Sequence, residues 1–461
     1  MIGLLLANAL FFAIGAGLLP LFRIATDRAT LVERLPLAYP VGVAATGIVA
    51  AHLALIDVPL GLVELVVLAA VVLFFGLRRA RRAGASNRLL LAEPRWSRIV
   101  GAGALAVSLV LLAHAWATYE IRPLLEWDGW AIWGTRSRAL YEFGGATGPV
   151  FTSDVYLPLQ HPLLLPSLDA IDFRAMGTYD PTLVHVQLAL LAFGFLLGFV
   201  SLLRDRVPFG LIGASALAVL SAEPVLKQLS TGLADIPLAF FVALGLLGLG
   251  QWLASGERWT LVTGTLFLGA ATLTKSEGLF FALAALLALA PFAWSRRREL
   301  GVAAGAVIAV VLPWRLFVSL RDLPLVEYRF RDAVSPAYLS DHSDRVSPAV
   351  RGLGGELLSG DWGLLVPLFL VAVAAAVLAR RYALAGFAVL WTALAFCGLV
   401  LVYWISAIPV DLALVWSGDR TIVTVVVGAA ALAPLLAGAA WTAPLRKSRI
   451  RSRGLETRED P

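Results

Sequence analysis

Long apolar stretches alternate with short polar turns along almost the whole chain. Runs of about 17 to 22 residues recur, and each is long enough to cross a hydrocarbon core of about 30 Å as a helix. Early examples cover about 1–22, 39–56, 60–77, 99–118 and 183–203. We count about 13 such runs. The pattern predicts an all-α polytopic membrane protein with about 13 transmembrane helices.

Composition supports this class. The 461 residues are 59% hydrophobic and 15% charged, whereas about a quarter of the residues of a soluble domain are charged. The net charge of +6 resides in short turns and in the C-terminal tail, so it indicates orientation in a membrane and not nucleic-acid binding. The single cysteine, Cys397, excludes an intrachain disulfide. No basic residue precedes the first apolar run, which favours a retained helix over a cleaved signal peptide.

Arginine clusters predict the orientation. The segment 78–98 is rich in arginine, so the positive-inside rule places it in the cytoplasm. The loops at about 119–182 and 321–362 then lie on the extracytoplasmic side of the cell membrane. We expect them to form short helices and loops that lie on the bilayer. Three regions result: 1–98 with three helices and a cytoplasmic basic loop, 99–445 with the remaining helices, and a cytoplasmic basic tail at 446–461. The later cytoplasmic turns carry Arg204, Arg206, Arg258, Arg296, Arg297, Arg298, Arg380 and Arg381.

The segment 120–141, EIRPLLEWDGWAIWGTRSRALY, gathers acids, tryptophans and arginines between two apolar runs. Glu126 and Asp128 flank Trp127, so in an extended or turn-like backbone both carboxylates can approach one hydroxyl group or one divalent cation. Alternatively, the tryptophans anchor the loop at the interface and the acids are solvated charges. In that case Asp128 caps a helix that begins near Trp130.

Three further stretches carry polar residues at helix ends, namely GLADIPLAF at 232–240, LTKSEGLF at 273–280 and SGDR at 417–420. Together with 120–141, they resemble the GT-C superfamily of membrane glycosyltransferases, and most closely its bacterial glycosyltransferase 39-like members. The resemblance covers most of the chain after about residue 100. It implies a GT-C-like helical bundle and an inverting hexosyl- or pentosyltransferase of cell-envelope glycan, glycolipid or glycoprotein synthesis.

The resemblance also implies the partners: a polyprenyl-phosphate-sugar donor and a glycan, lipid or protein acceptor, which meet among membrane lipids on the extracytoplasmic face. Asp128 is then the base or a metal ligand, and Glu126 is its partner. Lys275 and Arg420 are expected to meet one donor phosphate, with Arg420 opening the last helix after Asp419. The remaining substrate-binding candidates are Arg136, Arg138, Tyr156, His161, Asp235 and Glu277.

One departure leaves the cofactor open. The acidic pair reads Glu-Trp-Asp, whereas the family pattern has two adjacent acids or Asp-x-Asp. The candidate metal ligands are Asp128 and Glu126, and the expected ion is Mg²⁺ or Mn²⁺. No other cofactor is expected.

Structural alternatives stand beside these roles. Asp235 also suits the first turn of a helix because of the macrodipole. Lys275 and Arg420 also suit interface residues that snorkel. His161 is favoured as a packed loop histidine, because no second His or Cys stands at ligand spacing. Basic side chains such as those of Arg136 and Arg138 commonly bind bulk lipid head groups.

Two other functions are compatible with the composition. One is a lipid or polysaccharide transporter, flippase or polymerase without this chemistry, and the other is a structural membrane protein. A transporter is expected to show internal repeats and discontinuous helices with polar sites at the midplane. Neither feature is evident in the sequence.

Overall fold

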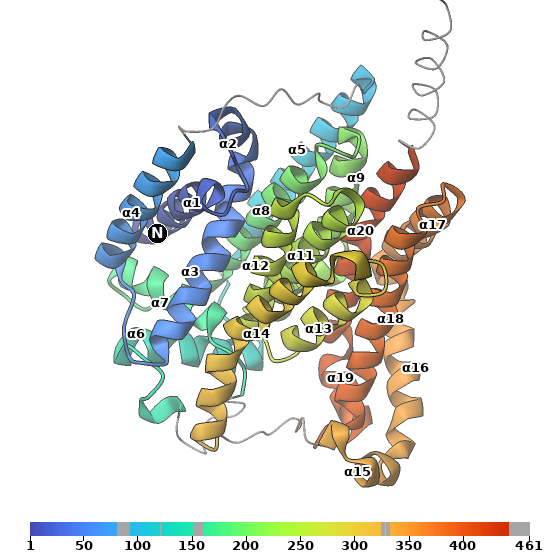
Figure 1. Cartoon of the computed structure of the whole chain (residues 1–461). Helices are drawn as coiled ribbons and strands as arrows, with labels where there is room; N and C mark the ends of the chain where they lie inside the picture. Colours follow the sequence, from blue (N-terminus) through green and yellow to red (C-terminus); the bar gives the residue numbers. More distant parts are fainter. Residues whose placement is uncertain (81–92, 120–121, 152–159, 324–327, 329–331, 442–461) are drawn as a thin grey trace, which may run out of the picture.

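The chain folds into a bundle of helices. A computed structural model describes residues 1–80, 93–119, 122–151, 160–323, 328 and 332–441. Within these residues every regular element is a helix, apart from one isolated antiparallel bridge between Tyr328 and Ser406. The long helices run side by side, and short helices such as α6 and α15 gather at one end of them (Figure 1). The predicted all-helical class is confirmed.

The helices fall into three sets by length. The longest are α1 (Ile2–Leu21), α3 (Ala38–Ala54), α4 (Leu62–Ala80), α5 (Arg95–Tyr119), α8 (Leu183–Leu203), α11 (Asp235–Ser255), α12 (Arg258–Thr274), α14 (Arg297–Leu320), α18 (Tyr382–Trp404) and α20 (Val423–Trp441). The next are α7 (Leu164–Met176), α9 (Phe209–Ser221), α13 (Gly278–Leu289), α16 (Val346–Leu357), α17 (Leu365–Leu378) and α19 (Val410–Thr421). The shortest include α2 (Arg28–Arg34), the π-helix η2 (Asp128–Gly134), α6 (Thr135–Phe143), α10 (Glu223–Leu229) and α15 (Pro336–Asp341).

Among the described residues, 8 helices are long and apolar enough to cross a membrane, or up to 10 if each of 2 bent helix pairs counts as one span. The helical membrane class is therefore supported, but the predicted number of about 13 spans is not confirmed. Some apolar runs form helices too short to count, such as α13 with 12 residues. Other apolar runs form helices of sufficient length that carry too many charged residues to count as spans, such as α4, which has charges at both ends.

The bent pairs correct one expectation from the sequence. The helices α9 and α10 meet at 63°, and the segment Ser343–Trp362 meets α17 at 98°. Bent pairs of apolar helices are thus present among the described residues, although they were not predicted from the sequence. Pro224 follows the break between α9 and α10, and proline is favoured in the first turn of a new helix.

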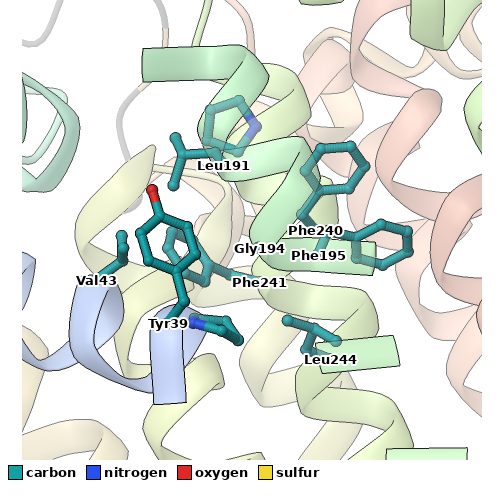
Figure 2. A pocket seen from close by; sticks show the side chains of 10 residues that line it. Tyr39, Val43, Leu191, Gly194, Phe195, Phe240, Phe241 and Leu244 are labelled. Atoms are coloured by element: carbon teal, nitrogen blue, oxygen red, sulfur yellow. The ribbon is translucent and has the colours of Figure 1, made fainter. Parts of the chain in front are cut away.

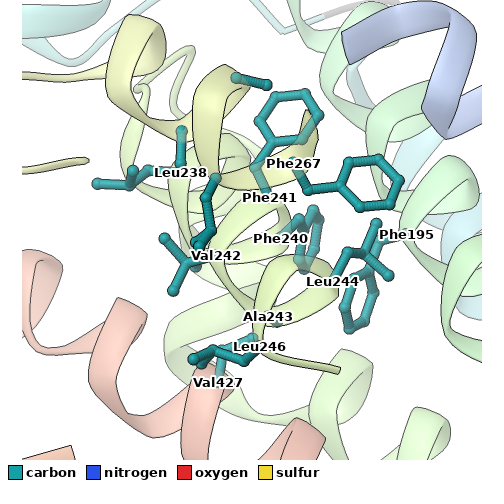
Figure 3. Close-up of a cluster of buried hydrophobic side chains, with 14 of the residues drawn as sticks. Phe195, Leu238, Phe240, Phe241, Val242, Ala243, Leu244, Leu246, Phe267 and Val427 are labelled. Carbon is teal, nitrogen blue, oxygen red and sulfur yellow. The ribbon is translucent and has the colours of Figure 1, made fainter. Parts of the chain in front are cut away.

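The helix α11 lies at the centre of the bundle and is buried along nearly its whole length. It packs against α8, α12, α13, α18 and α20. Its aromatic side chains meet those of its neighbours: Phe240 stacks on Phe195 at 4.4 Å between ring centroids, and Phe241 faces Phe267 (Figure 3). A helix of 21 residues spans about 31 Å. The two ends of α11 are therefore held at fixed and opposite places in the bundle.

The N-terminal helices belong to the same packed body. Tyr39 and Val43 of α3 lie against Leu191 and Gly194 of α8 (Figure 2). A Cβ atom on Gly194 would lie 2.9 Å from the Tyr39 ring, so only glycine allows this close approach. Within the predicted loop 119–182, the helix α7 is packed inside the protein. Its residues from Leu164 to Phe173 are all buried, and it packs against α1, α3 and α6.

The arginine-rich turns share one end of the bundle. Arg204 lies 3.8 Å from Glu33, Arg206 lies 3.4 Å from Glu257, and Arg258 lies 3.4 Å from Glu299, so the contacts join turns that are far apart in the sequence. The short helices α6 and α15 lie at the other end (Figure 1). Clustering of arginine-rich turns at one end is the pattern that the positive-inside rule associates with a cytoplasmic face.

We expect the end of the bundle with α6 to face the outside. In a Cys397→Ser background, Glu142→Cys at the end of α6 should react with a membrane-impermeant maleimide on intact cells. Arg298→Cys, at the arginine-rich end, should react only after the cells are made permeable. Both side chains are exposed, so accessibility alone decides the outcome. The reverse labelling pattern would invert the orientation.

Candidate functional site

Charged side chains from separate segments form one ion network of alternating sign. Arg420 Nη2 lies 2.6 Å from Asp128 Oδ2 and 3.6 Å from Asp235 Oδ2. Lys275 Nζ donates to Asp235 Oδ1 at 2.7 Å and lies 3.4 Å from Glu277 Oε1. Asp235 thus receives one cation on each carboxylate oxygen. We call these residues, Asp128, Arg420, Asp235, Lys275 and Glu277, the ion network.

The network has a more exposed end and a buried end. The side chains of Asp128 and Arg420 are 26% and 21% exposed. Those of Asp235, Lys275 and Glu277 are 3%, 7% and 7% exposed. Buried charges are costly unless they are paired, and the alternation of sign supplies the pairing. Among the described residues, the side of the network that is open to solvent is therefore that of Asp128 and Arg420.

Helix ends bring these residues together. Asp235 is the first residue of α11, where the macrodipole also favours an acid, so the predicted helix-end role and the ion pairs coexist. Lys275 follows α12 in an extended conformation, with φ −148° and ψ 156°. Gly278 then opens α13, and a Cβ atom there would lie 1.9 Å from the Ala271 carbonyl oxygen. Glycine therefore permits the tight return that places Lys275 beneath α11.

The structure corrects the position of Arg420. We expected it to open the last helix after a capping Asp419, but it lies in the last turn of α19, and α20 begins at Val423. Asp419 instead lies 3.4 Å from Lys227, and both of these side chains are exposed. The apolar composition of 410–441 conceals this helix boundary. Neither Lys275 nor Arg420 snorkels, because each is paired with an acid within the network.

Glu126 and Asp128 point to different arginines. Glu126 Oε1 accepts from Arg122 Nη2 at 2.9 Å, and Arg122 Nη1 also donates to Ser230 Oγ at 3.0 Å. Asp128 begins the π-helix and pairs with Arg420. Arg122 was not among the residues predicted from the sequence; it stands four residues before Glu126, in the non-helical segment ahead of the π-helix.

A divalent cation at Asp128 and Glu126 stays a prediction. In the described part of the chain, no group of three or more His, Cys, Asp or Glu side chains is arranged to hold a metal ion. The two carboxylates are each engaged by a guanidinium. Because each carboxylate is already paired with a guanidinium, the chemistry proposed below uses no metal ion.

His161 and Arg136 form a packed layer beside the network. The His161 ring stacks on Trp133 with 5.3 Å between centroids, and its Nδ1 lies 3.2 Å from the hydroxyl of Ser276, the neighbour of Lys275. Arg136 donates to the His161 carbonyl oxygen, and burial lowers the pKa of Arg136 to about 9. Both side chains are buried. This geometry matches the packed loop histidine, and it gives Arg136 a structural contact in place of one with bulk lipid.

Two other candidates for substrate binding, Arg138 and Tyr156, are not part of the network described here. Arg138 is exposed, lies 3.4 Å from Glu142, and has its guanidinium 5.1 Å above the Tyr179 ring. Tyr156 lies outside the described residues. Of the substrate-binding candidates, the network therefore brings together Asp235, Lys275, Glu277 and Arg420.

A second group of buried polar side chains, which was not predicted from the sequence, joins α7 to α1 and α8. Asp172 of α7 accepts from Asn8 Nδ2 at 3.3 Å, and the same amide donates to Gln187 of α8 at 3.0 Å. Asp169, three residues earlier on α7, accepts from Ser137 Oγ at 2.8 Å. Burial raises the pKa of Asp169 to about 7 and that of Asp172 well above its usual range. The two acids are three residues apart, so they lie on one face of α7. This spacing is the feature of the sequence from which the pair could have been predicted.

This pKa predicts a pH dependence of stability. Asp169 holds its proton up to about pH 7 in the fold, but an unfolded chain releases it near pH 4. Stability should therefore fall as the pH rises between these values. We expect the melting temperature in detergent to drop by several degrees between pH 5 and pH 8 in the wild type, and by less in Asp169→Asn. Asp419→Asn, an exposed control, should keep the wild-type drop. An equal drop in all three proteins would contradict the assignment.

Comparison with known proteins identifies no relative. No protein-family model, no curated protein and no solved structure matches the chain. The likeness to GT-C enzymes therefore depends on the four short sequence stretches alone.

Proposed function

We propose that the chain is a GT-C-type glycosyltransferase that moves a sugar from a polyprenyl-phosphate donor to an acceptor hydroxyl on the extracytoplasmic face. One observation carries the proposal. The four stretches of the resemblance, at 120–141, 232–240, 273–280 and 417–420, each contribute a side chain to the ion network. Stretches that share no local pattern thus converge on one cluster, as the parts of an active site do.

The exposed end of the network supplies the reacting groups. Asp128 accepts the proton of the acceptor hydroxyl as a general base. The acceptor oxygen attacks the anomeric carbon from the face opposite the phosphate, and the bond from that carbon to the phosphate oxygen breaks with its electron pair on the oxygen. Arg420 binds the phosphate, since a guanidinium matches phosphate oxygens bidentately, and stabilises the charge of the leaving group.

The buried end positions these groups. Lys275 is engaged by Asp235 and Glu277 and is buried, so we assign it a positioning role and not the direct phosphate contact expected from the sequence. Lys275 holds Asp235, and Asp235 Oδ2 lies 3.6 Å from Arg420 Nη2, the same nitrogen that contacts Asp128. The network thereby fixes the guanidinium before the donor arrives, which reduces the cost of ordering it during the reaction.

Purified full-length protein incubated with radiolabelled polyprenyl-phosphate sugars tests the proposal. Transfer of the label to a glycan, lipid or protein acceptor supports it, with Asp128→Asn as the inactive variant and Asp419→Asn as the active control. Intact donor after incubation with every sugar tried, from protein that remains folded and is supplied with envelope extract as acceptor, would reject it.

A transporter is the second candidate, because two observations favour it. The bent helix pairs resemble the discontinuous helices of transporters, and Asp169 and Asp172 are acids buried inside the protein. Proteoliposomes loaded with a labelled lipid-linked sugar distinguish the two functions. A transporter moves the lipid across the bilayer unchanged, whereas a transferase cleaves it.

A further inference from the structure

A polar cavity lies at the end of α11 and α20 that is opposite to the ion network. Its volume is about 460 Å³, and its walls include Arg206, Arg380 and Arg381. Leu253, near the end of α11, and Ala439, near the end of α20, also line it. The length of α11 separates it from Asp235 by about 30 Å. None of the residues singled out for sugar transfer takes part in it.

The charge of the lining favours an anion. Three arginines face a single acid, Asp205. Glu257, the partner of Arg206 at 3.4 Å, is not part of the lining. Arg381 uses its Nε to donate to the Ala439 carbonyl oxygen at 3.2 Å, which places the guanidinium against the cavity wall.

The turn between α17 and α18 presents two consecutive arginines to this cavity. Arg380 has φ +59°, a left-handed conformation that is unfavourable for a residue with a side chain. The backbone N–H groups of Arg380 and Arg381 donate to Val377 and Ala376 of α17, at 2.9 Å and 2.8 Å, and so hold the turn. The helix α18 then begins at Tyr382, and its first residues also line the cavity. The positive end of the macrodipole adds to the arginine charge.

The remaining walls are apolar. Leu253, Leu384 and Leu435 line the cavity beside the arginines, so one side suits a charged group and the other suits hydrocarbon. The volume lies within the range of about 300–1,000 Å³ that is usual for small-ligand sites. We propose that this cavity binds a phosphate group, namely the headgroup phosphate of an anionic membrane lipid whose acyl chains contact the leucines.

The test uses full-length protein in a neutral detergent and a fluorescent short-chain phosphatidic acid as the probe. Arg380→Gln and Arg381→Gln should each weaken probe binding about tenfold, as expected for a lost charge-assisted hydrogen bond. Arg298→Gln is the matched control, because Arg298 is an exposed arginine at the same end of the bundle and outside the cavity. It should bind the probe like the wild type. Melting temperatures confirm that each variant is folded.

Competition separates the two sources of phosphate. Unlabelled phosphatidic acid should displace the probe, while inorganic phosphate and a neutral diacylglycerol of the same chain length should not. Displacement by inorganic phosphate at similar concentrations would show a site for soluble phosphate and overturn the lipid assignment. An equal loss of binding in all three arginine variants, or no saturable binding to the wild type, would overturn the site itself.

Discussion

Asp235→Asn should reduce the free energy of unfolding by about 3–5 kcal/mol, the usual cost of removing one partner from a buried ion pair. The substitution preserves the shape of the side chain but removes the charge that faces both Lys275 and Arg420. Lys275 is 7% exposed, so water cannot replace the lost carboxylate, and among the described residues Glu277 remains as its acid. Denaturation of the purified protein in mixed micelles measures the loss.

Asp419→Asn is the matched control, since Asp419 is also paired with a lysine, at 3.4 Å, but that pair is exposed. Exposed pairs contribute about 0–1 kcal/mol. Adding Lys275→Met to Asp235→Asn should recover part of the lost stability, because the uncompensated buried charge is removed. If Asp235→Asn cost no more than Asp419→Asn, the ion network would not contribute to the fold as described.

Asp128→Asn should reduce the rate of sugar transfer by about 100- to 10,000-fold, the usual contribution of a general base. The amide preserves the size of the side chain but cannot accept the proton of the acceptor hydroxyl. Because Asp128 lies at the more exposed end of the network, we expect the melting temperature to change far less than in Asp235→Asn. Initial rates with a radiolabelled polyprenyl-phosphate sugar give the comparison.

Two further variants serve as comparisons for the rate of sugar transfer by Asp128→Asn. Asp419→Asn should transfer sugar at the wild-type rate, and Glu126→Gln should lose less activity than Asp128→Asn, because Glu126 faces Arg122 and not Arg420. Wild-type turnover by folded Asp128→Asn would remove this residue from the mechanism. A collapse of the fold in Asp128→Asn would assign it a structural role instead.

The apolar runs predicted the long helices well where a run coincided with one helix. The run at about 183–203 corresponds to α8, and the first run corresponds to α1. Prediction was poorer within 232–293, where Lys275 separates α12 from α13 and α13 has only 12 residues. It was poorer again at 410–441, where α19 ends and α20 begins within one apolar stretch. A run of apolar residues indicates that a segment is surrounded by lipid or by protein, but it does not indicate where one helix ends and the next begins.

The sequence by itself determined that this protein is a helical membrane protein, because the length and polarity of each run are local properties that the bilayer selects. It also indicated which polar residues needed explanation, including Asp128, Asp235, Lys275 and Arg420. Only the tertiary structure decided how these charges pair. Asp128 and Arg420, which pair with each other, lie more than 100 residues apart in the sequence. No local sequence pattern links such positions. The burial of α11 and the close approach at Gly278 create the water-poor environment in which those charges must pair with one another.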